Sequence, residues 1–200
     1  MDFSQSPVAT IIFLFTIVIS VIALYFKPSI IEKGVLRPYL IARGQNLGTL
    51  ISNGFLHANG MHLLFNMLTF YFFAFQLERT IGSLDFLILY FASMIIADIP
   101  SILQYRDNPE YASLGASGAI SGVVFSMILF YPFSGMYIFP IPFPLPAFVF
   151  GILYLIWSYF SAKNSDDVIN HSAHFWGAFA GIILTIILEP SSISIFINNF

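Results

Sequence analysis

Residues 114–122 read LGASGAISG, and this run of small residues at the start of an apolar segment decides how the rest of the chain is interpreted. Gly115 and Gly118 flank Ser117 and leave its hydroxyl open to close approach by another backbone or by a substrate carbonyl. That is a suitable setting for a nucleophile. Gly118 and Gly122 also form a GxxxG pair, a pattern by which membrane helices pack closely. Taken alone, the stretch leaves both interpretations open.

The composition indicates an integral membrane protein in contact with a lipid bilayer. Of the 200 residues, 58% are hydrophobic and only 8% are charged, and the mean hydropathy is +0.86. Soluble domains are about 25% charged. The net charge of −3 is dispersed, with no basic patch, so nucleic acid is not an expected partner. The chain has no cysteine, which excludes disulfides, thiol catalysis and Cys-ligated metals.

Apolar segments of about 20 residues are long enough to cross a bilayer as helices. The sequence predicts six of them, near residues 8–26, 58–77, 84–103, 115–132, 145–162 and 172–189. The first is interpreted as a span and not a cleaved signal, because no basic residue precedes Lys27. Prolines at 140, 142, 144 and 146 predict a loop or frayed entry to the fifth span. We expect one all-α membrane domain over residues 1–200.

The connection from Lys27 to Leu56 is long and mixes charged with apolar residues, so we expect it to lie on or partly in the membrane interface. Most basic residues lie in this first loop and in the third and fifth loops. These residues are Lys27, Lys33, Arg37, Arg43, Arg106 and Lys163, whereas Arg79 lies in the second loop. Taken alone, the positive-inside rule would place these odd-numbered loops in the cytoplasm.

Polar residues inside apolar spans are costly and are therefore candidates for function. His62 and Asn66 are four residues apart, so they share a helix face and can act on the same ligand atom. His57 lies five residues before His62, so its side chain does not share the helix face of His62 and Asn66. We interpret His57 as a structural hydrogen-bonding residue. Glu78 is expected at the interface, paired with Arg79, and Asp98 is expected there too.

The last predicted span carries His174, Gly177 and Gly181 on a single face. A histidine thus lies at the end of a GxxxG groove, for which the Gly118 and Gly122 face is the best partner in the chain. Packing of these two faces would bring His174 beside Ser117. In a six-span topology the second, fourth and sixth spans also enter from the same side. Their polar motifs therefore lie in one leaflet, which predicts a polar cavity that admits water.

These residues resemble the rhomboid family of intramembrane serine proteases. The resemblance rests on HANGMHLLFN at 57–66, ERTIGS at 78–83, GASG at 115–118 and AHFWG at 173–177 with Gly181. It covers the second to sixth spans, and the four motifs in this order are highly specific. It implies a six-transmembrane-helix rhomboid bundle with a cytoplasmic N-terminus. The site would open to the non-cytoplasmic side, with a cell (inner) membrane as the expected location.

The resemblance implies that Ser117 is the nucleophile and His174 its general base, acting as a dyad. The side chains of His62 and Asn66 and the backbone N–H of Ser117 would hold the oxyanion. Structural support is assigned to His57 and to five glycines. These are Gly115, Gly118, Gly122, Gly177 and Gly181. Substrates would be transmembrane proteins, no cofactor or metal is expected, and the oligomeric state is left open.

The chain departs from the family pattern at three places. A Trp-Arg pair common in the first loop is replaced by Gly48 and Thr49, and the arginine place after Glu78 holds Thr80. The aromatic residue that commonly stacks on the catalytic histidine, four positions after the serine, is Ser121 here. Another group must therefore orient His174.

Two other functions are compatible with the sequence. One is a catalytically inactive rhomboid-like protein that binds client helices, whose expected signature is loss of the serine or the histidine. The other is a metal site or transporter that uses the imidazoles of His57, His62, His171 and His174. The acidic residues of the predicted spans, Asp85, Asp98 and Glu189, are expected near the interface, so none is expected deep in the membrane to complete such a site. For the protease, the resemblance further implies that the Pro-rich entry and the fifth span form a lateral gate, with the loop around Ser165, Asp166 and Asp167 as a cap.

Overall fold

A computed structural model describes residues 3–137, 142–164 and 170–200. Its long helices are α1 (Pro7–Val21), α5 (Gly60–Ile81), α6 (Ser83–Tyr105), α7 (Ser117–Phe130), α8 (Ala147–Asn164) and α9 (His171–Leu188). Shorter helices are α2 (Ser29–Gly34), α3 (Pro38–Ile41), α4 (Thr49–Ser52) and α10 (Ser191–Asn198). A π-helical turn (Ile22–Phe26) extends α1, and 3-10 turns lie at Phe3–Gln5 and Asn53–Phe55. Strands β1 (Gly135–Met136) and β2 (Leu145–Pro146) form one antiparallel pair.

The predicted all-α membrane fold is confirmed, and the long helices follow the predicted segments to within a few residues. Among the described residues, four helices are long and apolar enough to cross a membrane: Pro7–Phe26, Gly60–Ile81, Ser83–Tyr105 and His171–Leu188. The apolar stretches Ser117–Phe130 and Ala147–Ala162 are shorter. The count of six spans therefore stays a prediction.

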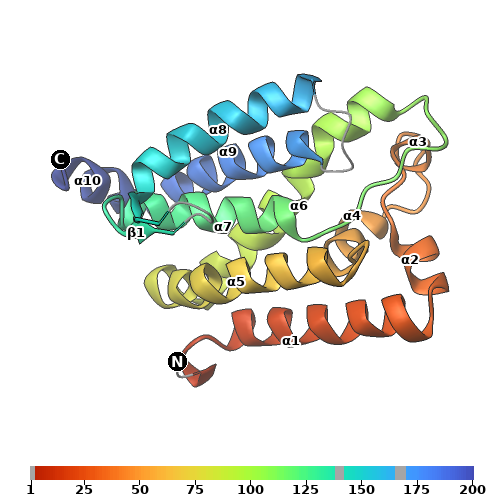
Figure 1. Cartoon of the computed structure of the whole chain (residues 1–200), viewed down its shortest axis with the longest axis horizontal. Helices are drawn as coiled ribbons and strands as arrows, with labels where there is room; N and C mark the ends of the chain where they lie inside the picture. The colour runs from red at the N-terminus through yellow and green to blue at the C-terminus, as the bar shows by residue number, and fades with distance from the viewer. Residues whose placement is uncertain (1–2, 138–141, 165–169) are drawn as a thin grey trace.

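Helix α7 is the central element of the bundle. It packs against α5, α6 and α9, and every residue from Gly118 to Ser126 is buried. A helix that is buried on all sides must be apolar or small on all sides, and the sequence of α7 meets this condition. Figure 1 shows α5, α7 and α9 beginning at one end of the molecule, while both termini lie at the other end. This places the starts of three polar-motif helices at a common level.

Glu78 lies near the end of α5 and is 1% exposed. Its carboxylate accepts hydrogen bonds from the backbone N–H groups of Val8 (3.0 Å) and Ala9 (2.6 Å), and from the hydroxyl of Ser83 (2.6 Å). The first N–H groups of a helix have no intrahelical acceptor, so Glu78 supplies one for α1. The predicted pairing of Glu78 with Arg79 is wrong, because Arg79 donates instead to Gln76 (2.7 Å).

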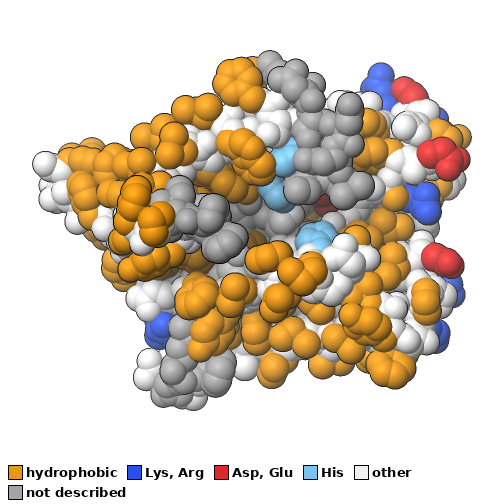
Figure 2. All heavy atoms as spheres, viewed as in Figure 1, with side chains coloured by type: hydrophobic (Ala, Val, Ile, Leu, Met, Phe, Trp, Pro, Cys, Tyr) orange, Lys and Arg blue, Asp and Glu red, His pale blue; other side chains and the backbone are white. Residues whose placement is uncertain are grey.

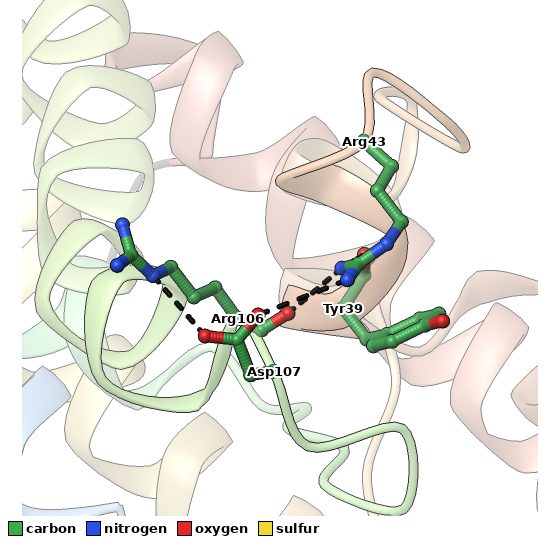
Figure 3. Close-up of polar contacts among 4 residues, drawn as sticks. All are labelled: Tyr39, Arg43, Arg106 and Asp107. Atoms are coloured by element: carbon green, nitrogen blue, oxygen red, sulfur yellow. Dashed lines mark hydrogen bonds and ion pairs between the residues drawn. The ribbon is translucent and has the colours of Figure 1, made fainter.

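The first loop folds as α2, α3 and α4 and is tied to the loop that follows α6. Figure 3 shows the guanidinium of Arg43 reaching the loop after α6. There it donates to the Arg106 carbonyl (2.9 Å) and lies 3.7 Å from the Asp107 carboxylate. The same guanidinium covers the Tyr39 ring at 3.6 Å. Leu36 and Ser113 exchange backbone hydrogen bonds nearby. These contacts anchor a loop that has Gly48 and Thr49 in place of the Trp-Arg pair.

Two segments differ from the sequence expectation, and a third lies outside the described residues. The proline-rich entry to α8 forms the β1–β2 hairpin, and α10 follows Pro190 as an unpredicted helix. Prolines limit backbone hydrogen bonding, and the described part of this segment forms a two-residue ladder. The cap predicted around Ser165, Asp166 and Asp167, and Pro140 of the entry, lie outside the described residues.

Candidate functional site

A cavity of about 890 Å³ lies among α5, α6, α7, α8 and α9. The predicted site residues that line it are His62, Asn66, Ser117 and His174. Figure 2 shows histidine side chains gathered at a hollow in a face that is otherwise largely hydrophobic. The bundle therefore brings side chains from three separate helices to one polar recess within an apolar surface.

Ser117 is the first residue of α7 and is half-buried. The turn before it depends on Gly115, whose φ of +126° is strained for any side chain. The Gly115 N–H donates to the Asn53 carbonyl (3.0 Å), which fixes this turn against the end of the first loop. Because the first N–H groups of a helix have no intrahelical acceptor, the Ser117 N–H is available at the cavity.

Helices α7 and α9 meet backbone to backbone at the predicted glycines. A Cβ atom on Gly177 would collide with the Gly118 carbonyl oxygen, and one on Gly181 with the Gly122 carbonyl oxygen. Side chains on α6 close the other side, since a Cβ on Gly118 would lie 2.6 Å from the Ala97 Cβ and one on Gly122 would lie 2.5 Å from the Ser93 Oγ. Only glycine fits at these four positions without a backbone or side-chain shift.

His62 lies over the turn that leads to Ser117. Its ring atoms Cε1 and Nε2 are 2.7 Å and 2.8 Å from where a Gly115 Cβ would be, so the absence of that Cβ makes room for the imidazole. The Ala58 N–H lies 3.5 Å from Nδ1. An accepting Nδ1 assigns the proton of a neutral ring to Nε2. One N–H of the Asn66 amide donates to the His62 carbonyl (3.0 Å), which leaves its second N–H for the cavity.

His57 is fully buried behind His62 and does not line the cavity. The Ser20 hydroxyl donates to the Phe55 carbonyl (2.7 Å), so it must accept from His57 Nδ1 at 2.9 Å. The His57 and His62 rings meet edge to face with centroids 4.9 Å apart. Burial, with the charge of His62 as the smaller cause, lowers the pKa of His57 from 6.5 to about 3. A neutral His57 therefore buttresses His62.

His174 and His171, one turn apart at the start of α9, face two aromatic rings of α8. The Tyr154 ring lies nearly parallel to that of His174, at an interplanar angle of 17° and a centroid distance of 6.4 Å. The Trp157 ring meets His171 edge to face at 4.7 Å. The Tyr154 hydroxyl is hydrogen-bonded to that of Ser121 (3.0 Å). The sequence analysis missed Tyr154, although a tyrosine and a tryptophan three residues apart match the spacing of the two histidines.

Two further polar residues at the cavity were not predicted as part of it. Asp98 is buried, contrary to its expected interfacial position, and accepts a hydrogen bond from the Asn53 amide (3.0 Å). Asn170 caps α9 through the Ala173 N–H (3.0 Å) and donates to Ser101 (3.0 Å) and Ser113 (3.1 Å). An asparagine directly before the HSAH run was the available signal for this helix cap.

The four histidines do not converge on a metal. Among residues 3–137, 142–164 and 170–200 there is no group of three or more His, Asp or Glu side chains that could hold an ion. They form two ring pairs, His57 with His62 and His171 with His174. Nothing in this arrangement favours the metal-site alternative.

The fold and the cavity define a class: a helical membrane protein whose polar residues surround a recess between its helices. The family model of the rhomboid domain matches residues 44–191 of the chain. The chain therefore belongs to the rhomboid family, and the resemblance seen in its motifs is confirmed.

Several relatives of known family share parts of the sequence. The rhomboid-family protein YdcA of Bacillus subtilis is 42% identical over 95 residues, which cover 44% of this chain and 46% of YdcA. Rhomboid protein 1 of Saccharomyces cerevisiae mitochondria is 29% identical over 68% of this chain and 40% of its own length. The rhomboid protease GlpG of Yersinia enterocolitica is 25% identical over 84% of this chain and 60% of its own length. The chain thus spans about half the length of these relatives.

Proposed function

We propose that this protein is an intramembrane serine endopeptidase that cleaves peptide bonds in or near transmembrane helices of other membrane proteins, with Ser117 and His174 as its dyad. The observation that carries the proposal is the backbone contact between α7 and α9 at Gly118 and Gly177. This contact holds the first turn of α7 against the second turn of α9, about one turn after His174, beside a cavity that both proposed dyad residues line. The named rhomboid proteases among the relatives support the same activity.

The proposed chemistry has two steps. The Ser117 hydroxyl attacks the scissile carbonyl carbon while His174 takes its proton, and His174 then gives that proton to the leaving amine. Water next attacks the acyl carbon on Ser117 while His174 takes its proton, and His174 gives that proton to the Ser117 oxygen as the ester bond breaks and the new carboxyl end leaves. A histidine base suffices for serine chemistry, so a dyad without a third carboxylate is chemically complete.

The oxyanion of each tetrahedral intermediate needs fixed donors. The proposed donors are His62 Nε2–H, the second N–H of Asn66 and the backbone N–H of Ser117. Each donor of this kind is typically worth about 3 kcal/mol of transition-state stabilisation. The contact of His57 with His62 and the Asn66 bond to its own helix hold two of these groups in place before substrate arrives.

A transmembrane substrate must unwind before it is cut, because a helix hides its carbonyls in backbone hydrogen bonds. Substrates with Gly, Ala or Pro near the cleavage site would open most easily. Helix α8 and the hairpin before it are the proposed gate for entry from the bilayer. Its outer side chains include Ile152, Leu153, Ile156 and Phe160, all more than half exposed.

We further propose that the site opens to the non-cytoplasmic side of a cell membrane and that residues 1–200 act as one domain. Six spans would then place both termini in the cytoplasm. The positive-inside rule argues the opposite, but most of the basic residues that it counts lie in the first loop, which is folded into α2, α3 and α4. A C-terminal tag in sealed inverted vesicles should be digested by added protease. Protection of the tag there, with cleavage in right-side-out vesicles, would overturn this orientation.

The activity is tested by labelling the purified protein with a serine-directed fluorophosphonate and by cleavage of a reporter transmembrane helix in liposomes. We expect the wild type to do both and Ser117→Ala and His174→Ala to do neither. Ser194→Ala is the matched control, since Ser194 is exposed on α10 and bonds only to its own helix in the described contacts. It should behave as the wild type does.

Three results would contradict the proposal. Labelling that persists in Ser117→Ala would reject the nucleophile. A folded wild type that neither labels nor cleaves would favour the inactive, client-binding alternative. Stoichiometric zinc after purification without chelator would favour the metal-site alternative.

A further inference from the structure

Helix α8 contacts the candidate base through Tyr154. The Tyr154 ring lies alongside the His174 ring, 17° from parallel with centroids 6.4 Å apart. This is within the 4.5–7 Å range of offset-stacked ring pairs. The Tyr154 hydroxyl is fixed at its other end by the 3.0 Å hydrogen bond to Ser121. Tyr154 is therefore held from both sides, by α9 through its ring and by α7 through its hydroxyl.

Ser121 is one helical turn after Ser117 on α7 and is buried. The chain Ser121, Tyr154, His174 thus starts on the helix that carries the candidate nucleophile and ends on its candidate base. A serine at 121 leaves space that an aromatic side chain would fill, and the Tyr154 ring enters from α8. Away from water a hydrogen bond between two hydroxyls is strong and directional, so Ser121 sets where the ring lies.

We propose that Tyr154 is a positioning residue for His174, supplied by α8 and oriented by Ser121, so that the dyad is fully assembled only when α8 is docked on α7 and α9. The proposal rests on the proposed protease function and goes beyond it, because it makes the position of α8 a determinant of catalytic competence. The second ring contact, Trp157 on His171, reinforces the same docking.

Helix α8 packs less extensively against α7 and α9 than those two helices pack against each other, which gives this arrangement its consequence. Several of its large side chains are exposed, including Ile152 (56%), Trp157 (50%) and Phe160 (58%). A movement of α8 away from α9 would remove the ring from His174 and break the bond to Ser121 in one step. Entry of a substrate helix beside α8 is then coupled to the orientation of the base, and catalysis requires α8 to return.

The test compares fluorophosphonate labelling kinetics of four variants in the full-length protein in liposomes. Tyr154→Leu removes the ring and should lower the maximal labelling rate about tenfold while the half-saturating reagent concentration stays the same, because orientation and not binding is lost. Tyr154→Phe keeps the ring and should recover most of this loss. Ser121→Ala should match Tyr154→Phe. Phe26→Leu, an exposed ring on the turn that extends α1 and outside the cavity lining, is the control and should label as the wild type does.

The double variant Ser121→Ala with Tyr154→Phe keeps the test decisive if Tyr154→Leu fails to fold. We expect the double variant to be no slower than either single variant, since both remove the same hydrogen bond. Additive losses, or a wild-type maximal rate in a folded Tyr154→Leu, would overturn the positioning role. Either result leaves the protease proposal intact as long as the wild type labels and Ser117→Ala does not. A wild type that does not label would overturn both.

Discussion

The carboxylate of Glu78 accepts a 2.6 Å hydrogen bond from the backbone N–H of Ala9, across 69 residues of sequence. With the Val8 bond, and with the 2.9 Å bond from the Ser6 hydroxyl to the Phe75 carbonyl, it fastens the start of α1 to the end of α5. A negative charge at a helix N-terminus is also favoured by the helix dipole.

Glu78→Gln should therefore destabilise the protein. Gln keeps the shape but loses the charge and one acceptor oxygen, so we expect a loss of about 2 kcal/mol, measured as thermal unfolding in detergent. Glu110→Gln, an exposed carboxylate, is the control and should change stability by less than about 0.5 kcal/mol. Equal losses in the two variants would show that the cap contributes nothing.

Gly177→Ala should separate α7 from α9. The new methyl group would meet the Gly118 backbone, with its Cα only 3.0 Å away, so a helix has to move. We expect a loss of about 2 kcal/mol in stability and at least about a tenfold loss of fluorophosphonate labelling, since the proposed dyad depends on this contact. Gly48→Ala is the matched control, because its backbone is helical and nothing lies within 4 Å of the added atom. Wild-type labelling by Gly177→Ala would refute the packing role.

His57 should make the folded state sensitive to mild acid. Its pKa is about 3 in the folded protein and 6.5 when unfolded, so below pH 6.5 only the unfolded chain takes up the proton. Stability therefore falls as the pH drops from 6.5 toward 3. His57→Gln keeps a polar group for Ser20 without this titration. Its stability should fall less steeply than that of the wild type between pH 6.5 and 5, and identical slopes would exclude the effect.

Arg43 should contribute more to the first loop than its ion pair suggests. Exposed salt bridges are worth about 0–1 kcal/mol, so Asp107→Asn should have little effect. Arg43 also donates to two carbonyls and covers the Tyr39 ring. Arg43→Ala should therefore speed proteolysis of the loop several-fold more than Asp107→Asn does. The reverse order would mean that the ion pair is the main anchor.

The parts of the molecule that follow from local spacing could be predicted from the sequence. Gly118 and Gly177 lie where a GxxxG pattern places them, and α5, α6 and α9 begin within about two residues of the expected segments, because hydrophobic length and small-residue spacing act within one helix. The approach of His62 to Gly115 could not be foreseen in the same way, although both belong to motifs that the sequence displayed.

The parts that depend on rotation and register between helices could not be predicted. Tyr154 lies on α8, whose apolar residues surround the whole helix, so no pattern indicates which ring faces His174. Asp98 near a helix end can be either interfacial or buried, and only the packing of Asn53 against it decides. Two of the partners of Glu78 are backbone N–H groups, which leave no trace in the residue types at Val8 and Ala9.

The length of α7 determines how deep in the membrane the proposed nucleophile lies. Fourteen residues make a helix of about 21 Å, whereas the hydrocarbon layer is about 30 Å thick. If the far end of α7 reaches one membrane surface, Ser117 lies roughly 9 Å below the other, about the span of three extended residues. Cleavage of a substrate would then depend on the membrane depth at which its helix unwinds as well as on its side chains. Moving the unwound site by one helical turn should prevent cleavage.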